Sequence, residues 1–285
     1  MNKHIDKKNK YIFLFYALAN IALAMQLGKD ATKLSLLMMA VNIILGIDWT
    51  FKCFGFKRSI LFIAISFAVA FGLETLSMKT GYPYGHFRHN LDTVMVGSVP
   101  LVACFMYFPL IAIGWVYGDM IVKSVPVTKS SETILRILIA SLVTATIDLL
   151  VDPILTLVFR FWDYPNGGGI FGVPMTNIVG WMANTVLTLT IFELISNKNW
   201  KRPQDRIECL YGPVCYLMLA QAIPLFVARF TLENRIVADV TGKGWNLLDI
   251  YDCLSAFALV VLGLLFVLGT IGHETYEKRM KKAAR

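Results

Sequence analysis

Long apolar runs dominate this sequence, and they limit the folds that the chain can adopt. Eight runs are about 20 residues long, the length that an α-helix needs to cross the hydrocarbon core of a bilayer; they cover residues 11–27, 34–51, 60–77, 97–118, 133–158, 175–195, 209–230 and 253–271. Hydrophobic residues make up 56% of the chain and charged residues only 16%, a balance that excludes an ordinary soluble domain. The sequence therefore predicts an all-α fold, a polytopic transmembrane helical bundle of about eight spans.

The basic residues predict the orientation of this bundle. Lysine and arginine gather in alternate loops and near both ends of the chain, as in segments 3–10, 198–206 and 278–285. Positive charge accumulates on the cytoplasmic side of membrane proteins, so we expect both termini in the cytoplasm and a multi-pass protein of the cell membrane. No linker or low-complexity segment divides the chain, which predicts a single integral membrane domain over residues 1–285.

Net charge and cysteine content narrow the function classes. The formal charge of +8 is spread between the apolar runs, so it does not form the basic patch that nucleic acid binding requires. The five cysteines have no CxxC spacing, which argues against a zinc site or a disulfide framework. The pair His86 and His89 supplies only two ligands, whereas zinc sites need three or four. We therefore expect neither nucleic acid nor a bound metal.

Two carboxylates interrupt the fifth apolar run. Asp148 and Asp152 are four residues apart and so lie on one helical face, and Pro153 is expected to kink the helix directly after them. Acidic side chains inside a membrane are costly and are by default functional candidates. In the predicted topology the third span places Glu74 toward the same leaflet, and the sixth span begins there with Asn177. The sequence thus predicts one polar site near the outer face.

Other polar residues keep to helical faces in the same three spans. We expect these stripes to face the bundle interior, where polar groups find partners; they comprise Ser141, Thr144, Asp148, Asp152 and Thr156, then Ser66, Ala70, Glu74 and Ser77, then Asn177, Trp181, Asn184 and Thr188.

The acidic residues have a structural and a chemical interpretation. A structural role would pair Asp148 and Asp152 with Arg136 or Arg160, or use them to join helices. The chemical role follows from their proximity, because carboxylates that share a desolvated site cannot all be ionised cheaply. At least one is then expected to keep its proton beside an ionised neighbour, which makes an acid next to a base.

Two segments rich in glycine and proline flank the site and carry aromatic residues. The turn from Thr80 to His86 holds Tyr82 and Tyr84, and a glycine-rich segment at 166–174 holds Phe171. The glycine-rich segment fits either a flexible turn or a re-entrant loop, which is tolerated at membrane depth only where it is buried or lines a cavity. In the second case Trp162, Tyr164, Phe171 and Trp181 would wall an apolar slot; an interfacial aromatic belt is the alternative.

A set of motifs across residues 60–195 resembles the carotenoid biosynthesis protein family, in its cofactor-independent carotenoid 1,2-hydratase group. The set consists of Glu74, Thr80-Gly81-x-Pro83-x-Gly85, Val99-Pro100, Asp148-x-x-x-Asp152-Pro153, Trp162, Phe171-Gly172-Val173-Pro174, Asn177 and Gly180-Trp181. The resemblance implies a hydro-lyase that adds water across the terminal C1–C2 double bond of an acyclic carotenoid or related isoprenoid and yields a tertiary alcohol.

The residues permit the chemistry that the resemblance implies. Protonation of a trisubstituted alkene needs a neutral carboxylic acid, for which Asp148, Asp152 and Glu74 are the catalytic candidates. Aromatic faces stabilise a cation, and a second carboxylate with Asn177 is suited to hold and deprotonate the attacking water. The substrate-binding candidates are Tyr82, Tyr84, Trp162, Phe171, Asn177 and Trp181. Expected partners are a long apolar isoprenoid, water and membrane lipid, with no cofactor.

Two other functions remain open at this stage. An intramembrane prenyltransferase would use Asp148 and Asp152 as half of an aspartate-rich magnesium site, with Asp249 and Asp252 as the other half. A transporter or an isoprenoid-binding protein without enzymatic activity is favoured by the broken fifth helix, but the two halves of the chain show no repeat.

Overall fold

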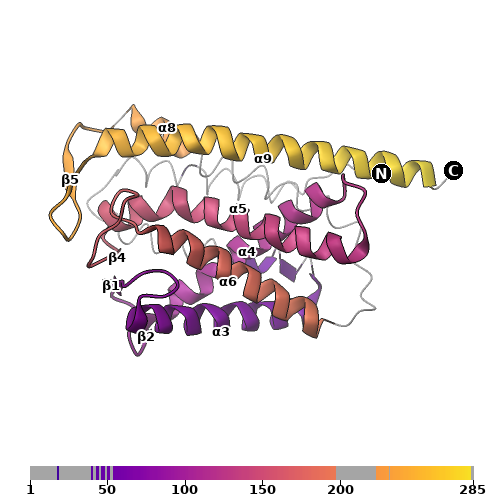
Figure 1. Cartoon of the computed structure of the whole chain (residues 1–285), viewed down its shortest axis with the longest axis horizontal. Coiled ribbons are helices and arrows are strands. Elements are labelled where there is room, and N and C mark those ends of the chain that lie inside the picture. The colour runs from indigo at the N-terminus through magenta and orange to yellow at the C-terminus, as the bar shows by residue number, and fades with distance from the viewer. Residues whose placement is uncertain are drawn as a thin grey trace.

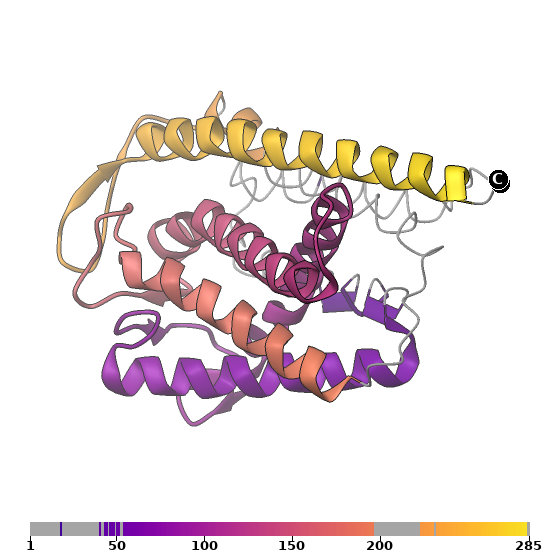
Figure 2. The ribbon, with the colours of Figure 1, turned by 45° about the vertical axis from the view of Figure 1, so that its right-hand side comes forward.

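The structure is a computed structural model that describes residues 54–196, 223–230 and 232–283, together with isolated positions between 18 and 51. Within these residues the bundle has five long helices (Figure 1), and they are α3 (Phe56–Thr80), α4 (Leu101–Val122), α5 (Lys129–Leu157), α6 (Met175–Ile195) and α9 (Leu247–Ala283). A short helix, α8 (Ile223–Arg229), packs beside α9. Figure 2 shows α9 along one side of the bundle and α3 along the other.

The five long helices confirm five of the predicted spans. Each contains a stretch long enough and apolar enough to cross a membrane, and these stretches are Phe56–Thr80, Leu101–Val122, Ser130–Leu157, Met175–Ile195 and Leu247–Gly272. The predicted span at 97–118 begins later than expected, because Val99 and Pro100 belong to a β-hairpin and Pro100 caps the helix. Most of each of the predicted spans 11–27, 34–51 and 209–230 lies outside the described residues.

Local sequence accounts for the helix ends. The Thr128 hydroxyl accepts a hydrogen bond from the Ser131 backbone nitrogen and caps α5, as short polar side chains do at helix N-termini. Gly81 ends α3 in the left-handed conformation, φ 82°, and its N–H donates to the Ser77 carbonyl. Helix α5 continues through Pro153 to Leu157, so this proline does not end the helix.

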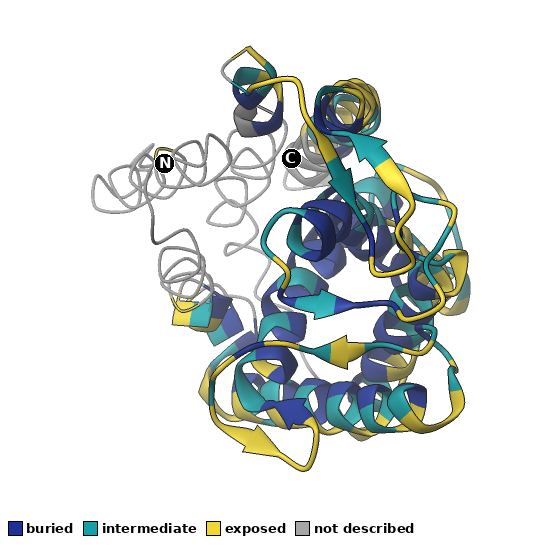
Figure 3. Cartoon of the chain, turned by 90° about the vertical axis from the view of Figure 1, so that its left-hand side faces the viewer, coloured by how far each residue is buried: buried dark blue, intermediate teal, exposed yellow. Residues whose placement is uncertain are grey.

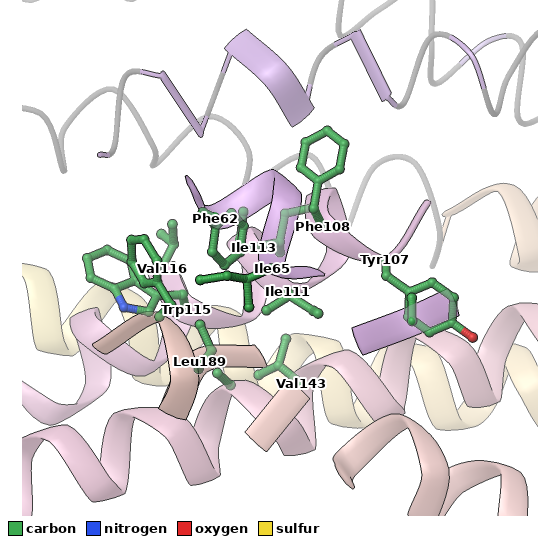
Figure 4. Close-up of a cluster of buried hydrophobic side chains, with 14 of the residues drawn as sticks. Phe62, Ile65, Tyr107, Phe108, Ile111, Ile113, Trp115, Val116, Val143 and Leu189 are labelled. Carbon is green, nitrogen blue, oxygen red and sulfur yellow. The ribbon is translucent and has the colours of Figure 1, made fainter. Parts of the chain in front are cut away.

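Helix α4 lies in the centre of the bundle and is buried on almost every side. Its apolar residues form the main core with side chains from α3, α5 and α6 (Figure 4). Two glycines bring α4 close to α5: an added Cβ at Gly114 would lie 2.6 Å from the Ala140 carbonyl oxygen, and one at Gly118 would lie 2.5 Å from that of Arg136. Small residues at a helix crossing permit this close approach.

The predicted polar stripes face the interior. The described stripe residues of α5 and α3 are buried, as are Asn177, Asn184 and Thr188 of α6, while Trp181 is partly buried. The outer faces of α3 and α9 expose apolar side chains instead, among them Ile60 and Val260. Helices in lipid are expected to place polar side chains toward one another and apolar side chains on their outer faces. Figure 3 shows the buried residues gathered between the helices.

Between the helices, the described residues form three two-stranded antiparallel sheets, which the all-α prediction did not include. They pair β1 (Arg88–His89) with β4 (Trp162–Asp163), β2 (Met95–Val96) with β3 (Val99–Pro100), and β5 (Ile236–Ala238) with β6 (Gly244–Asn246). β1, β4 and β5 lie at one end of the bundle (Figure 1). The β1–β4 pairing ties the α3–α4 connection to the α5–α6 connection, so it joins the two loops nearest the predicted polar site.

Candidate active site

Asp148 and Asp152 meet at a single amide group. The side-chain nitrogen of Asn177 donates to Asp148 Oδ2 at 2.6 Å and to Asp152 Oδ2 at 2.8 Å. Both aspartates come from one face of α5, and Asn177 comes from the first turn of α6. The shared nitrogen therefore keeps the two carboxyl groups within two hydrogen-bond lengths of each other, on the one helical face that their four-residue spacing predicts.

Asp152 is the more fully hydrogen-bonded of the two. Its Oδ1 accepts from Trp162 Nε1 at 2.5 Å and from the Thr156 hydroxyl at 3.2 Å. Its Oδ2 accepts from the Tyr164 hydroxyl at 2.9 Å, in addition to Asn177. A carboxylate has about four lone-pair positions for donors, so all of them are occupied. Four donors around one buried carboxyl group stabilise its ionised form.

Asp148 has a different environment. Among the described residues its only hydrogen bond from a side chain is the one from Asn177 to Oδ2. Asp148 is 6% exposed and Asp152 is 1% exposed, so both are buried but only one is saturated with donors. An acid with few donors beside an ionised neighbour favours its neutral form. The two chemically identical side chains are therefore placed in unlike settings.

Glu74 lies close by and is paired with a histidine. Its Oε2 is 3.0 Å from His89 Nε2, and both side chains are 3% exposed. His89 is directly opposite Trp162 in the β1–β4 pairing, and the two rings are 6.0 Å apart. Because Trp162 also donates to Asp152, the Glu74–His89 pair and the aspartate pair are separated by one side chain.

The negative charge of the site raises the pKa of two tyrosines that lie outside the membrane-spanning helices. Burial raises the pKa of the Tyr164 hydroxyl well above its usual value, and Asp152, Asp148 and Glu74 raise it further. Burial also raises the pKa of Tyr84, against hydrogen bonds that lower it, and Glu74 and Asp148 add to the increase. All three predicted catalytic carboxyl groups thus act on the same small region.

Tyr84 is held between α6 and the α3–α4 connection. The Asn184 side chain donates to its hydroxyl at 2.7 Å, and the Ser77 hydroxyl accepts from its backbone nitrogen at 2.8 Å. The ring lies against Gly180, where an added Cβ would be 2.3 Å from a ring carbon. Glycine at this position is what allows the aromatic ring to reach the helix.

Trp181 stacks on Tyr107 of α4, with ring centroids 4.3 Å apart and an interplanar angle of 18°. The Tyr107 ring is in turn 6.3 Å from that of Tyr84. Packed aromatic rings therefore continue from the Tyr84 turn to the interface of α4 and α6.

Two predicted substrate-binding residues lie away from the carboxyl groups. Tyr82 is 70% exposed on the Tyr82–Pro83 turn. Phe171 packs against Trp245 of β6 at 5.4 Å and belongs to the second apolar cluster, around α9. The 166–174 segment closes on itself through the Ile170–Val173 bridge. The Phe171 ring therefore packs on the β5–β6 hairpin, where its aromatic partner is Trp245.

Several site residues were not predicted as such from the sequence, namely His89, Tyr107 and Asn184. Tyr164 was expected only as part of an apolar wall. A signal existed for two of them: Tyr164 is two residues after Trp162, so both side chains of an extended segment point the same way. Asn184 follows Asn177 by seven residues, which is two helical turns. Tyr107 is not distinguishable in sequence from the other core aromatics.

The ion pairs of Arg136 and Arg160 test the structural role considered for Asp148 and Asp152. Arg136 pairs with Asp119 and Glu132, and Arg160 pairs with Asp163 and donates to the Ala238 carbonyl. Neither arginine is the partner of the aspartate pair, so the proposed structural salt bridge is not formed.

The prenyltransferase alternative requires Asp249 and Asp252 to face the aspartate pair. Both are exposed on the first turns of α9, and Asp252 pairs with Arg229. Within the part of the chain that the structure describes, no three His, Cys, Asp or Glu residues are grouped to hold a metal ion. The second half of an aspartate-rich magnesium site is therefore not assembled.

The fold and the site together define a helical membrane protein with a pair of buried carboxyl groups bridged by an amide. The chain belongs to the carotenoid biosynthesis protein family, which matches residues 31–242. It is similar to the bisanhydrobacterioruberin hydratase of Haloarcula japonica, with 24% identity over 188 residues, which cover 64% of this chain and 61% of that protein. The matched region thus spans less than two thirds of the relative. No solved structure matches the chain.

Proposed function

We propose that this protein is a hydratase of acyclic carotenoids that adds water across the terminal C1–C2 double bond to give a tertiary alcohol. Membership of the carotenoid biosynthesis family and the hydratase relative support this class of reaction. The observation that carries the proposal is the Asn177 bridge between two aspartates of unequal hydrogen bonding. Such a pair supplies a neutral acid and a fixed negative charge in one apolar site.

Asp148 is the acid in this proposal, and Asp152 remains ionised. The four donors to Asp152 hold its charge in place, and that charge makes ionisation of Asp148 unfavourable. Asp148 therefore keeps its proton at neutral pH. General acids contribute about 10²–10⁴-fold to a rate when their proton is available at the working pH.

The reaction begins when Asp148 donates this proton to the less substituted carbon of the alkene. A tertiary cation forms, and the charge of Asp152 and the face of Trp162 stabilise it; an aromatic face contributes about 1–2 kcal/mol to a desolvated cation. Water then attacks the cation. In this proposal Glu74, the third carboxyl group of the site, serves the water side of the reaction, and the Tyr84, Tyr107 and Trp181 rings hold the polyene.

The same proposal includes the arrangement in the membrane. Eight spans with both termini in the cytoplasm would place the site toward the outer leaflet of the cell membrane, within a single domain. Apolar outer faces on α3 and α9 support insertion in lipid. A carotenoid dissolved in the bilayer would then reach the site without leaving the apolar phase.

Expression in a host that accumulates lycopene tests the function. We expect a pigment heavier than lycopene by one water, formed without an added cofactor. Asp148→Asn should abolish this product, and Asp92→Asn is the matched control, because Asp92 is an exposed residue of the α3–α4 connection. Unchanged pigment from well-inserted wild-type protein would contradict the proposed reaction and favour a binding or transport protein.

A further inference from the structure

In the proposed hydration, the attacking water must lose a proton, and Asp152 is a poor base for this step. Its oxygens already accept four hydrogen bonds, from Thr156, Trp162, Tyr164 and Asn177. Protonation of Asp152 would displace one of these donors, and a buried donor without a partner costs about 1–3 kcal/mol. The proton that water loses therefore goes to a group other than Asp152.

His89 is suited to receive this proton. Its Nε2 is 3.0 Å from Glu74 Oε2, and a carboxylate at this distance fixes the tautomer with the proton on Nε2. The lone pair then resides on Nδ1, which is buried and has no hydrogen-bond partner among the described residues. A buried imidazole nitrogen with an available lone pair is a competent general base.

The position of His89 is fixed by its surroundings. Its ring packs edge-on against Phe87 at 5.2 Å and against Trp162 at 6.0 Å. Its backbone lies opposite that of Trp162 in the antiparallel β1–β4 pairing. Since Trp162 also donates to Asp152, this one indole contacts both the imidazole and the aspartate pair.

We propose that His89, positioned by Glu74, is the general base that deprotonates the attacking water. This inference rests on the hydratase function proposed above. It assigns Glu74 a positioning role in place of a direct catalytic one, in the way that a buried carboxylate orients the histidine of a hydrolase triad.

The proton balance of the cycle is complete with this assignment. Asp148 gives its proton to the alkene, whose π electrons form the new C–H bond. A lone pair of the water oxygen forms the C–O bond, and the water proton passes to His89 Nδ1 while the O–H electrons stay on oxygen. The imidazolium is balanced by Glu74 until its proton returns to the Asp148 carboxylate. The net change is alkene plus water to tertiary alcohol.

The test compares His89→Gln with wild type in membranes supplied with an acyclic carotenoid in heavy water. Glutamine keeps an N–H donor for Glu74 but has no basic nitrogen. We expect hydration to fall by about 10²-fold or more. Asp148 still transfers a deuteron from heavy water to the alkene, and the carotenoid cation can lose a proton from the same carbon back to the Asp148 carboxylate, so the recovered alkene should gain deuterium. His86→Gln is the matched control, because His86 is an exposed histidine of the same connection and should change hydration less than about twofold.

The outcomes separate this inference from the function on which it rests. Hydration by His89→Gln at the wild-type rate would overturn the role of His89 and leave the hydratase intact. Loss of both hydration and deuterium uptake would also overturn it, since His89 would then only support the structure. Absence of hydration in wild type would overturn the hydratase and the base together. Glu74→Gln, which retains an acceptor for Nε2–H, should reduce hydration less than His89→Gln does.

Discussion

The unequal settings of the two aspartates predict unequal costs of the same substitution. In Asp152→Asn an NH₂ group replaces one oxygen, and each oxygen of Asp152 accepts two hydrogen bonds. Whichever way the amide turns, two buried donors face another donor. At about 1–3 kcal/mol for each unsatisfied buried group, Asp152→Asn should lower the free energy of unfolding by about 2–6 kcal/mol.

Asp148→Asn should cost much less. Its amide oxygen can still accept the hydrogen bond from Asn177, which is the one side-chain bond that Asp148 accepts among the described residues. We expect a loss below about 1 kcal/mol, within the range of one ordinary hydrogen bond. The two variants therefore share the loss of carotenoid hydration but differ in stability.

Thermal unfolding of the detergent-purified proteins measures this difference. For a chain of this size, 1 kcal/mol corresponds to about 2 °C in Tm, so Asp152→Asn should melt at least about 4 °C below wild type. Asp148→Asn and the exposed control Asp92→Asn should melt within about 2 °C of it. Equal destabilisation by the two aspartate variants, or a greater loss in Asp148→Asn, would refute the assignment of the saturated carboxylate to Asp152.

Two further substitutions test other parts of the site. Trp162→Phe keeps an aromatic ring but removes the N–H donor to Asp152. A hydrogen bond to a charged group contributes about 1.5–3 kcal/mol, so the rate of hydration measured in membranes should fall about 10–150-fold. An unchanged rate would show that this hydrogen bond does not contribute to catalysis. Gly180→Leu would force a side chain into the Tyr84 ring, which lies 2.3 Å from an added Cβ, and should reduce both the yield of folded protein and the amount of product. Gly263→Leu on α9 is the control, because an added Cβ there meets nothing within 4 Å. This variant should behave as wild type in chromatography and in the pigment assay.

The main elements of the bundle were predictable because helical periodicity is a local property. The spacing of Asp148 and Asp152 places both on one face of α5 whatever surrounds them, and the topology brought Glu74 and Asn177 to the same end. The contact of Asn177 with both aspartates was not predictable, because it depends on how α6 packs against α5.

The loops were the least predictable part of the site. The β1–β4 pairing places His89 opposite Trp162, but each strand has only two residues, too few for an alternating pattern. Phe171 was expected at the site because it follows a run of glycines, and it contacts Trp245 instead. The partner of an aromatic side chain in such a loop is decided by tertiary packing, to which the local sequence gives no signal.

The origin of the product oxygen tests the central claim most directly. Membranes containing this protein are incubated with an acyclic carotenoid under nitrogen, in water enriched in the heavy oxygen isotope, and the product is analysed by mass spectrometry. Hydration by an acid at Asp148 predicts a tertiary alcohol that carries the heavy isotope, and no product from Asp148→Asn. Product formation that requires molecular oxygen, or an alcohol without the label, would contradict the account.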